Sequence, residues 1–333
     1  MASAASWTSY GGHGDAEDVR GLWSGNTGTL DSISLFAKAL PWRFGAGALL
    51  TLALMAPRAP RTPRTSPTSA SPARPRGTVT RGTTNPNRLR RMDRWIAAVH
   101  GAALRRAADP LAVDLGYGAA PWTAVELLLR LRTAAPRARV VGIEIDPARV
   151  EAARPYEREG LSFLHGGFEV PLPARPVLIR AANVLRQYDE GEVAAAWELL
   201  CARLAPGGLL VEGTCDEIGR RHVWVALGAQ GPRTVTFAAR LASLERPSDL
   251  AERLPKALIH RNVPGEPVHA FLRDFDRAWA AAAPYASYGA RQRWIRAVRE
   301  LRADWPVVDG ATRWRQGEVT VEWGALAPRG GGG

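Results

Sequence analysis

Residues 111–121 read LAVDLGYGAAP, and this stretch decides the fold. An apolar run, broken only by Asp114, leads into a turn that carries Gly116 and Gly118. Continuous apolar runs of this length are typical of strands buried on both faces of a parallel sheet. Glycines after such a strand let the backbone turn tightly and come close to a ligand. The stretch therefore predicts a first strand that ends in a ligand-binding turn.

Strands and helices alternate around this turn. Short apolar runs predict further strands at residues 139–143, 161–164, 177–181 and 208–212. Helical spacing of apolar residues predicts helices at residues 89–107, 122–134, 147–156 and 189–204. Beyond residue 217 the pattern predicts a hairpin (222–227 with 234–240), a helical region and a last strand at 318–323. The alternation predicts an α/β fold with a doubly wound, mostly parallel sheet and a C-terminal helical insertion.

The residue after the glycine turn helps to identify the ligand. In a doubly wound sheet, ligands bind outside the carboxyl ends of the strands, beside the first strand. The dinucleotide pattern requires a small residue three positions after Gly118, where the helix packs closely on the strand. Here Pro121 occupies that position, and its ring suits a loop or a first helical turn instead. A nicotinamide-dependent oxidoreductase is therefore disfavoured, although it stays open as an alternative.

Three motifs resemble those of the class I S-adenosylmethionine-dependent methyltransferases. The first, acid-x-Gly-x-Gly-x-Gly, is matched by residues 114–120, with Ala120 in place of the last glycine. The second, an acid that ends the second strand, is matched by Glu144. The third, Leu-x-Pro-Gly-Gly-x-Leu, is matched by residues 204–210. The resemblance covers roughly residues 93–217 and implies a Rossmann-like methyltransferase fold with a seven-stranded sheet, in a domain at residues 85–328.

The resemblance also implies a binding site for S-adenosyl-L-methionine. Asp114 would lie near the cationic ammonium and sulfonium groups, and Glu144 would accept both ribose hydroxyls. Gly167 stands where the family usually has an aspartate that meets the adenine, so that contact would pass to Phe168. Together, the residues implied as cofactor-binding are Asp114, Gly116, Tyr117, Gly118, Glu144, Ile145, Gly167, Phe168 and Asn183.

The catalytic residues stay unassigned at this stage. Methyl transfer from a sulfonium needs alignment and desolvation, and it needs a general base only when the nucleophile arrives protonated. His165, His222, His260 and Tyr188 are candidate bases, although a lone histidine more often has a structural role. No cluster of His, Cys and acidic residues has metal-ligand spacing, so no metal is predicted.

Much of the net charge of +12 lies at the start of the predicted domain and before it. Ten arginines and one aspartate fall between residues 57 and 94, and residues 57–84 are rich in Pro, Arg, Ser and Thr. Such a composition cannot bury a core, so we predict a disordered linker at 57–84. Arg88 and Arg91 are either a solvated helix face or anion contacts at a pocket rim.

Residues 1–56 show no sustained hydrophobic period. The apolar run at 44–56 is too short for a membrane span, and it begins too far from the N-terminus for a signal peptide. Because Met55 comes immediately before the linker, we hypothesise that residues 1–54 are an over-extended gene start. The two cysteines, Cys201 and Cys215, form no Cys-x-x-Cys motif and indicate reduced thiols in a cytoplasmic protein.

The sequence thus predicts an enzyme that transfers a methyl group from S-adenosylmethionine to a small-molecule acceptor by in-line displacement. It predicts no membrane partner. It disfavours a nucleic-acid partner, because the Asn/Asp-Pro-Pro-aromatic motif of amino-methylating nucleic-acid enzymes is absent after the fourth strand. Besides the oxidoreductase, two alternatives stay open: a catalytically silent S-adenosylmethionine-binding module, and a nucleic-acid methyltransferase that uses the arginine-rich linker as a tether.

Overall fold

The computed structural model of the 333-residue chain describes residues 74–82 and 84–329. The chain divides into two units at residue 68, and all described residues belong to the second. The unpatterned segment 1–56, its apolar run at 44–56, the proposed gene start and linker residues 57–73 therefore lie outside the described residues. None of the described helices is long and apolar enough to cross a membrane.

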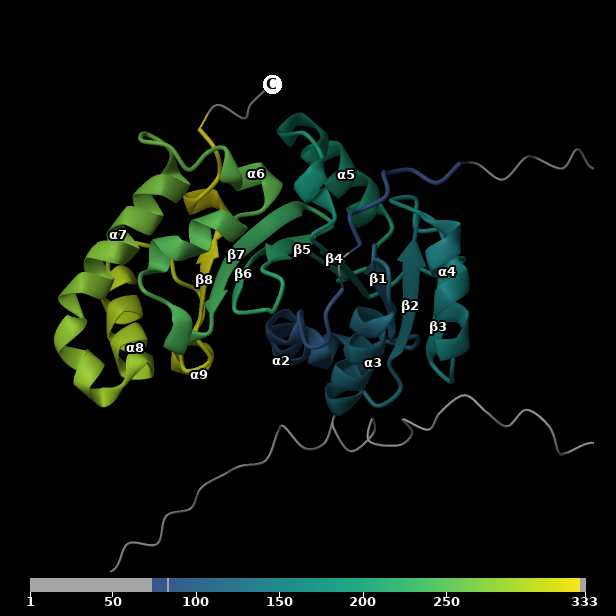
Figure 1. Cartoon of the computed structure of the whole chain (residues 1–333), viewed down its shortest axis with the longest axis horizontal. Helices are drawn as coiled ribbons and strands as arrows, with labels where there is room; N and C mark the ends of the chain where they lie inside the picture. Colours follow the sequence, from purple (N-terminus) through teal and green to yellow (C-terminus); the bar gives the residue numbers. More distant parts are fainter. Residues whose placement is uncertain (1–73, 83, 330–333) are drawn as a thin grey trace, which may run out of the picture. The chain divides into compact units, whose positions relative to one another are not determined.

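An eight-stranded sheet forms the centre of the described unit, with strand order β3-β2-β1-β4-β5-β6-β7-β8 (Figure 1). The strands are β1 (Leu111–Leu115), β2 (Arg139–Glu144), β3 (Leu161–His165), β4 (Leu178–Ala182), β5 (Leu209–Cys215), β6 (Arg221–Gly228), β7 (Gly231–Ala239) and β8 (Glu318–Glu322). Strands β1 to β5 are parallel, and β6, β7 and β8 pair antiparallel to their neighbours. The α/β doubly wound fold is confirmed.

The expected count of seven strands is wrong by one. The predicted hairpin is confirmed as β6 and β7, and it extends the sheet beyond β5. The chain then leaves for the helical insertion and returns as β8, which pairs with β7 along five residues. An eighth strand forms because the returning segment covers the otherwise open edge of β7 with apolar Val319 and Val321.

Helices cover both faces of the sheet. The helices are α2 (Arg90–Arg106), α3 (Trp122–Ala134), α4 (Pro147–Ala153), α5 (Glu190–Ala202), α6 (Lys256–Ile259), α7 (Pro267–Ala281), α8 (Ala290–Leu301) and α9 (Ala311–Trp314). Apolar residues of α2, α3 and α4 pack in one core cluster, and those of α5, α7 and α8 pack in the other. Helices α7 and α8 form the predicted insertion and lie beside the β8 end of the sheet (Figure 1).

Most predicted elements appear within three residues of their expected bounds. Residues 111–115 and 122–134 match β1 and α3 at both ends. Helix α5 begins after Asp189, as its capping potential indicated, and the Asp189 N–H donates to the Glu192 carboxylate at 2.8 Å. The predicted helix at 147–156 ends early, because Pro155 has no N–H with which to continue the helical hydrogen bonds; residues 154–156 form a 3-10 turn instead.

A buried arginine joins the central strands to the helices on one face. Arg180 of β4 is fully buried and lies in register beside Asp114 of β1. Its guanidinium binds both oxygens of Asp114, at 3.0 and 2.7 Å, and also binds Asp93 of α2. Its Nη2 donates to the Thr123 carbonyl of α3 at 2.9 Å. One cation thus ties together β1, β4, α2 and α3.

The opposite charges in this network shift one another's pKa values: Arg180 favours the ionised carboxylate of Asp93, and the two acids favour the protonated guanidinium of Arg180. Burial raises the pKa of Asp93 to about 6, and the neighbouring Arg180 opposes that rise. Burial alone lowers the pKa of Arg180, but Asp114 and Asp93 raise it above its ordinary value. The guanidinium therefore stays protonated, and its removal leaves two buried carboxyl groups without their cation.

We expect Arg180→Met to destabilise the chain by about 3–5 kcal/mol, because breaking a buried ion pair leaves uncompensated buried charge. Arg139→Met is the matched control, since Arg139 pairs with Asp109 at 2.6 Å but both side chains are exposed. That exposed pair is worth only ~0–1 kcal/mol. Urea unfolding of both variants measures the difference, and equal losses would show that the buried network is energetically neutral.

Candidate functional site

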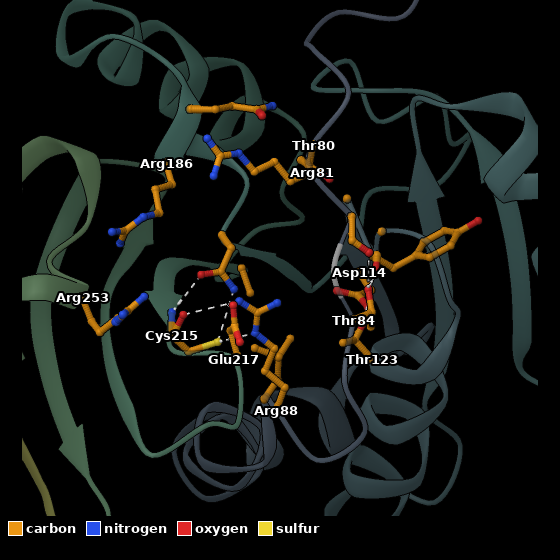
Figure 2. A pocket seen from close by; sticks show the side chains of 18 residues that line it. Thr80, Arg81, Thr84, Arg88, Asp114, Thr123, Arg186, Cys215, Glu217 and Arg253 are labelled. Carbon is orange, nitrogen blue, oxygen red and sulfur yellow. Dashed lines mark hydrogen bonds between the residues drawn. The ribbon is translucent and has the colours of Figure 1, made fainter.

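A cavity of about 370 Å³ opens at the carboxyl ends of β1 and β4 (Figure 2). Chain connections run in opposite directions from these two neighbouring strands, toward β2 and β3 on one side and β5 on the other. Doubly wound sheets bind ligands at such a switch point, because the loops there diverge and leave a crevice. Of the residues expected at the cofactor, Asp114, Gly116, Tyr117, Gly118 and Asn183 line this cavity.

The glycine turn is built around a close backbone approach. Gly118 has a φ of +86°, a conformation that side chains rarely adopt. A Cβ atom at this position would lie 2.6 Å from the Thr84 hydroxyl oxygen. Gly118 also donates its N–H to the Glu144 carboxylate at 2.9 Å. The turn is therefore held between the end of β2 and the segment that precedes α2.

Asp114 has different partners from those that the sequence suggested. Its side chain is 2% exposed, and its oxygens accept from Arg180 and from the Thr123 hydroxyl at 2.7 Å. No bond from Asp114 to a loop amide is present among the described residues. The acid reaches the cavity wall, but its charge is balanced from behind by Arg180.

Glu144 holds the loop amides instead. It is 1% exposed and accepts from the N–H groups of Gly118 and Ile145, at 2.9 and 3.1 Å. Nη1 of Arg149 lies 3.6 Å from Oε1 of Glu144, the oxygen that accepts from Ile145. The carboxylate expected to take ribose hydroxyls therefore already orients the glycine turn against β2.

A short segment of backbone, residues 76–82, crosses the carboxyl edge of the sheet; we call it the strap. The Arg76 carbonyl accepts from the Phe168 N–H at 2.9 Å, and the Thr78 N–H donates to the Tyr188 hydroxyl at 2.6 Å. The approach is close, because a Cβ on Gly167 would lie 2.0 Å from the Arg76 carbonyl oxygen. Between the strap and the sheet remains a cavity of about 20 Å³.

The far end of the strap bonds to the glycine turn. The Gly82 carbonyl accepts from the Ala119 N–H at 3.0 Å, and the Thr80 carbonyl accepts from Arg149 at 2.9 Å. Just beyond the strap, the Thr84 hydroxyl donates to the Tyr117 carbonyl at 2.9 Å. Residues 76–82, which belong to the predicted linker, thus find backbone hydrogen-bond partners on the domain.

The strap divides the expected cofactor residues into two groups. Glu144, Ile145, Gly167 and Phe168 line the small cavity beneath the strap, together with Gly116. The other expected residues line the large cavity beside the strap. Among these nine residues, Gly116 alone lines both cavities; Thr80 of the strap lines both as well. The structure thus brings the nine residues to one edge of the sheet but not into one open pocket.

Asn183, directly after β4, is fixed in an uncommon backbone conformation. Its φ is +60°, in the left-handed region that Asn tolerates better than most residues. Its Oδ1 accepts from the Cys215 N–H at 2.9 Å, and its Nδ2 lies 3.2 Å from the Cys215 sulfur. Strained residues held by side-chain bonds of this kind cluster at functional sites.

The three histidines considered as bases lie away from the large cavity. His222 is fully buried on β6, and burial lowers the pKa of its ring to about 3. His165 bonds through Nε2 to the Ile145 carbonyl at 3.0 Å, and His260 follows α6. Tyr188 lines the small cavity and holds the strap. None of these four side chains lines the space where an acceptor would meet the glycine turn.

Several cavity residues were absent from the sequence-based set. Arg81, Arg88, Arg186 and Arg253 line the large cavity, as does Cys215. The sequence allowed Arg88 to be either part of a solvated helix face or an anion contact at a pocket rim. Its place at the cavity favours the anion contact. The proline pattern held a signal for the strap, because no proline occurs between Pro75 and Pro86. Among residues 74–82 and 84–329, no group of three or more potential metal ligands occurs.

The chain matches no protein-family model and no curated protein. Part of it is similar to human N-acetylserotonin methyltransferase in complex with S-adenosylmethionine, at 26% identity over 36% of this chain and 35% of that chain, with a TM-score of 0.26. Part is similar to magnesium protoporphyrin IX methyltransferase from Synechocystis, at 19% identity over 38% of this chain and 53% of that chain, with a TM-score of 0.29. Part is also similar to a probable spermidine synthase from Corynebacterium glutamicum, at 20% identity over 38% of this chain and 47% of that chain, with a TM-score of 0.28.

The chain therefore spans 35% to 53% of the length of these three proteins. They differ in the activity that their names give, so similarity of this extent does not decide the reaction. The function has to rest on the residues of this chain.

A further buried acid, Glu212, does not line the cavity, and it makes stability depend on pH. Burial raises the pKa of Glu212 on β5 to about 8. The unfolded chain releases this proton near pH 4.3 and the folded chain near pH 8, so the unfolding free energy falls as pH rises between these values.

We expect Glu212→Gln to remove this contribution, because the amide carries no titrating proton. The variant's unfolding free energy should fall less between pH 5 and pH 8 than that of the wild type, in urea unfolding at each pH. Glu198→Gln is the control, since Glu198 is exposed on α5. Parallel curves for the wild type and Glu212→Gln would contradict the assignment.

Proposed function

We propose that the protein binds S-adenosylmethionine and transfers its methyl group to a small-molecule acceptor. The observation that carries this proposal is the 370 Å³ cavity at the β1–β4 switch point, lined by the glycine turn. Its volume is in the range of small-molecule sites, which run from ~300 to 1,000 Å³. Two of the three sequence motifs that resemble those of methyltransferases, the glycine turn after β1 and Glu144 at the end of β2, lie at this same edge of the sheet, which supports the assignment. The third, residues 204–210, leads into β5 at the opposite edge.

The residues fit the two halves of the cofactor differently. The large cavity offers Gly116, Gly118 and Asn183 to the methionine half. The adenosine half belongs beneath the strap, beside Glu144 and Phe168, where about 20 Å³ is open. That half fits only when residues 76–78 leave the sheet edge, so the proposal includes a displacement of the strap.

Bound there, the cofactor supplies an electrophilic methyl group, which an acceptor takes by displacement. The work of the chain is to hold both molecules in line and to exclude water. The glycine turn, fixed by Glu144, and Asn183, fixed by Cys215, provide rigid walls for this alignment. Because none of the candidate histidines lines the cavity, we propose an acceptor that arrives deprotonated or releases its proton to solvent.

A catalytically silent binding module is the second candidate. The strap occupies the adenosine side, and no candidate base lines the large cavity, which favours this alternative. Release of S-adenosylhomocysteine in the presence of an acceptor distinguishes an enzyme from such a module.

We expect S-adenosylmethionine and S-adenosylhomocysteine to stabilise the full chain against heat, whereas NADH does not. A ligand at 100 times its dissociation constant adds ~2.7 kcal/mol, which raises the Tm by roughly 5–10 °C for a domain of this size. Differential scanning fluorimetry with the three ligands side by side measures these shifts. A shift with NADH alone would replace the proposal by the oxidoreductase alternative.

We expect Tyr188→Phe to tighten cofactor binding, because it removes the hydroxyl that holds the Thr78 N–H of the strap. A hydrogen bond of ~0.5–1.5 kcal/mol corresponds to a roughly 2- to 10-fold gain in affinity. Titration calorimetry with S-adenosylhomocysteine measures it. Tyr156→Phe is the control, since Tyr156 packs edge-on against Trp122 and lines neither cavity.

Unchanged or weaker binding by Tyr188→Phe would mean that the strap does not compete with the cofactor. Such a result would not contradict the proposal that the protein binds S-adenosylmethionine, because the thermal shift of the wild type tests that proposal separately.

A further inference from the structure

The large cavity carries an excess of positive charge. Four arginines line it, from four separate parts of the chain: Arg81, Arg88, Arg186 and Arg253. Two acids, Asp114 and Glu217, line it as well. Asp114 is balanced by the buried Arg180, so it does not neutralise the arginines on the wall.

Two of these arginines lie together on the side of the cavity opposite the glycine turn. Figure 2 shows Arg186, which follows β4, and Arg253, from the insertion, extending toward the same region. Arg186 donates to the Glu252 carbonyl at 3.1 Å, and Arg253 Nε lies 3.4 Å from the Glu252 carboxylate. Burial, and then the charge of Arg253, lower the pKa of Arg186. The two cations therefore repel each other, and an anion between them would relieve that repulsion.

The nearby acids are shared among more cations than they can neutralise. The Glu252 carboxylate binds Arg221 at 2.8 Å as well as Arg253. Asp249 lies 3.5 Å from the same Arg221. One exposed carboxylate thus serves two guanidinium groups, and among the described residues Arg186 bonds to a main-chain carbonyl.

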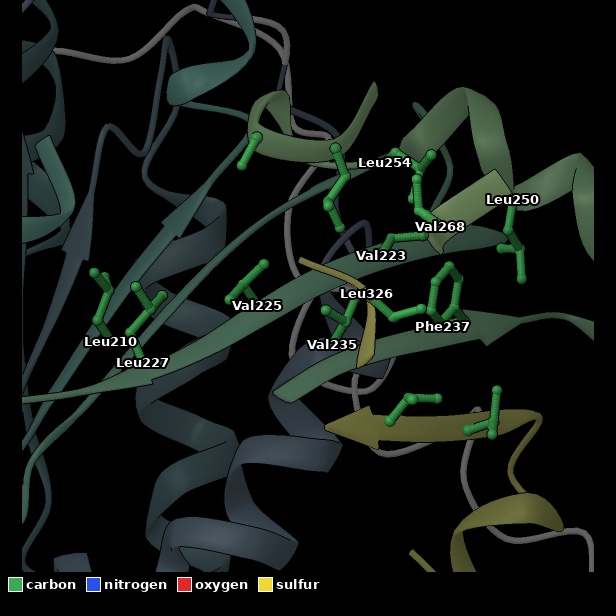
Figure 3. Packing of buried hydrophobic residues seen from close by; sticks show 14 of the residues in the cluster. Leu210, Val223, Val225, Leu227, Val235, Phe237, Leu250, Leu254, Val268 and Leu326 are labelled. Atoms are coloured by element: carbon green, nitrogen blue, oxygen red, sulfur yellow. The ribbon is translucent and has the colours of Figure 1, made fainter. Parts of the chain in front are cut away.

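Arg253 is held in place by the core. Leu250 and Leu254, on either side of it, are buried among Val223, Phe237 and Val268 (Figure 3). The Thr214 hydroxyl of β5 donates to the Arg253 carbonyl. The backbone that presents this guanidinium is therefore rigid, which lowers the entropy cost of binding a ligand.

Arg88 lines the same cavity and also holds two parts of the chain together. Its Nε donates to the Cys215 sulfur at 3.2 Å and to the Asp216 carbonyl at 3.1 Å. It thus links the segment before α2 to the end of β5, where Cys215 also fixes Asn183. Arg81, on the strap, brings a further positive charge to the cavity.

We propose that the large cavity binds a small organic anion, whose carboxylate or phosphate group lies between Arg186 and Arg253. Planar guanidinium forks match both groups, since each presents paired N–H donors to paired oxygens. This inference deepens the proposed function by naming the class of the methyl acceptor, and it rests on that function for the reaction. Binding of the anion itself requires no cofactor.

The test uses calorimetric titration of the full chain with benzoate and, separately, with inorganic phosphate. The wild type should bind at least one of them, and the one it prefers identifies the group. Arg186→Gln and Arg253→Gln should each weaken that binding by about tenfold or more, because each removes a charged fork. Arg186→Lys should recover only part of the loss, since a lysine keeps the charge but not the fork.

Arg154→Gln is the matched control and should bind the probe as the wild type does. Arg154 is an exposed arginine, paired with Glu151 at 2.7 Å, and it does not line the cavity. Circular dichroism and the Tm of each variant confirm that it is folded. Absence of binding by the folded wild type, or equal binding by all variants, would overturn the proposal.

Titration with S-adenosylhomocysteine separates this proposal from the proposed function. The arginine variants should keep wild-type affinity for it. If they lose affinity by the same factor as for the probe, the arginines hold the carboxylate of the cofactor, and the acceptor proposal is wrong. If the wild type binds the anion but not S-adenosylhomocysteine, the anion site stands and the methyltransferase proposal fails.

Discussion

The buried guanidinium of Arg180 is the interaction on which the rest of the site depends. It lies at the centre of the parallel sheet with Asp114 beside it, and no water can replace either partner there. Through Asp93 and the Thr123 carbonyl it also fixes α2 and α3 against the strands. The glycine turn runs between β1 and α3, so both of its ends are set by this one cation.

Because Asp114 binds Arg180, the acid of the first motif has a structural role within the protein. An acid two residues before a glycine turn suggests a charge offered to a ligand. Here the charge of Asp114 is used within the protein, and Glu144 performs the task of holding the turn amide of Gly118. Both acids are at the expected places in the sequence and in the fold, but their hydrogen bonds are made to the chain itself.

The fold was predictable because its pattern is local. Short apolar runs at 111–115 and 177–181, each with one charged residue, predict strands that the structure places at 111–115 and 178–182, and Asp189 marks the start of α5. The end of the sheet was harder, because the pairing of β8 with β7 depends on a return across the whole insertion. The strap could not be predicted from hydrophobicity, since its contacts are backbone hydrogen bonds to Phe168, Tyr188 and Ala119. Periodicity records which side chains are buried, and the strap buries none of its own.

The arginines of the cavity escaped prediction for a related reason. Arg81, Arg186 and Arg253 are far apart in the sequence, and it is the fold that brings them to one cavity. With Asp114 balanced from behind and Glu144 turned to backbone amides, the cavity offers a cationic cofactor little opposite charge. Affinity for such a cofactor would then depend on its adenosine half, which the strap covers. In the proposals made above, the position of the strap therefore governs cofactor entry, and the charge of the arginine wall governs the choice of acceptor, as two separate controls.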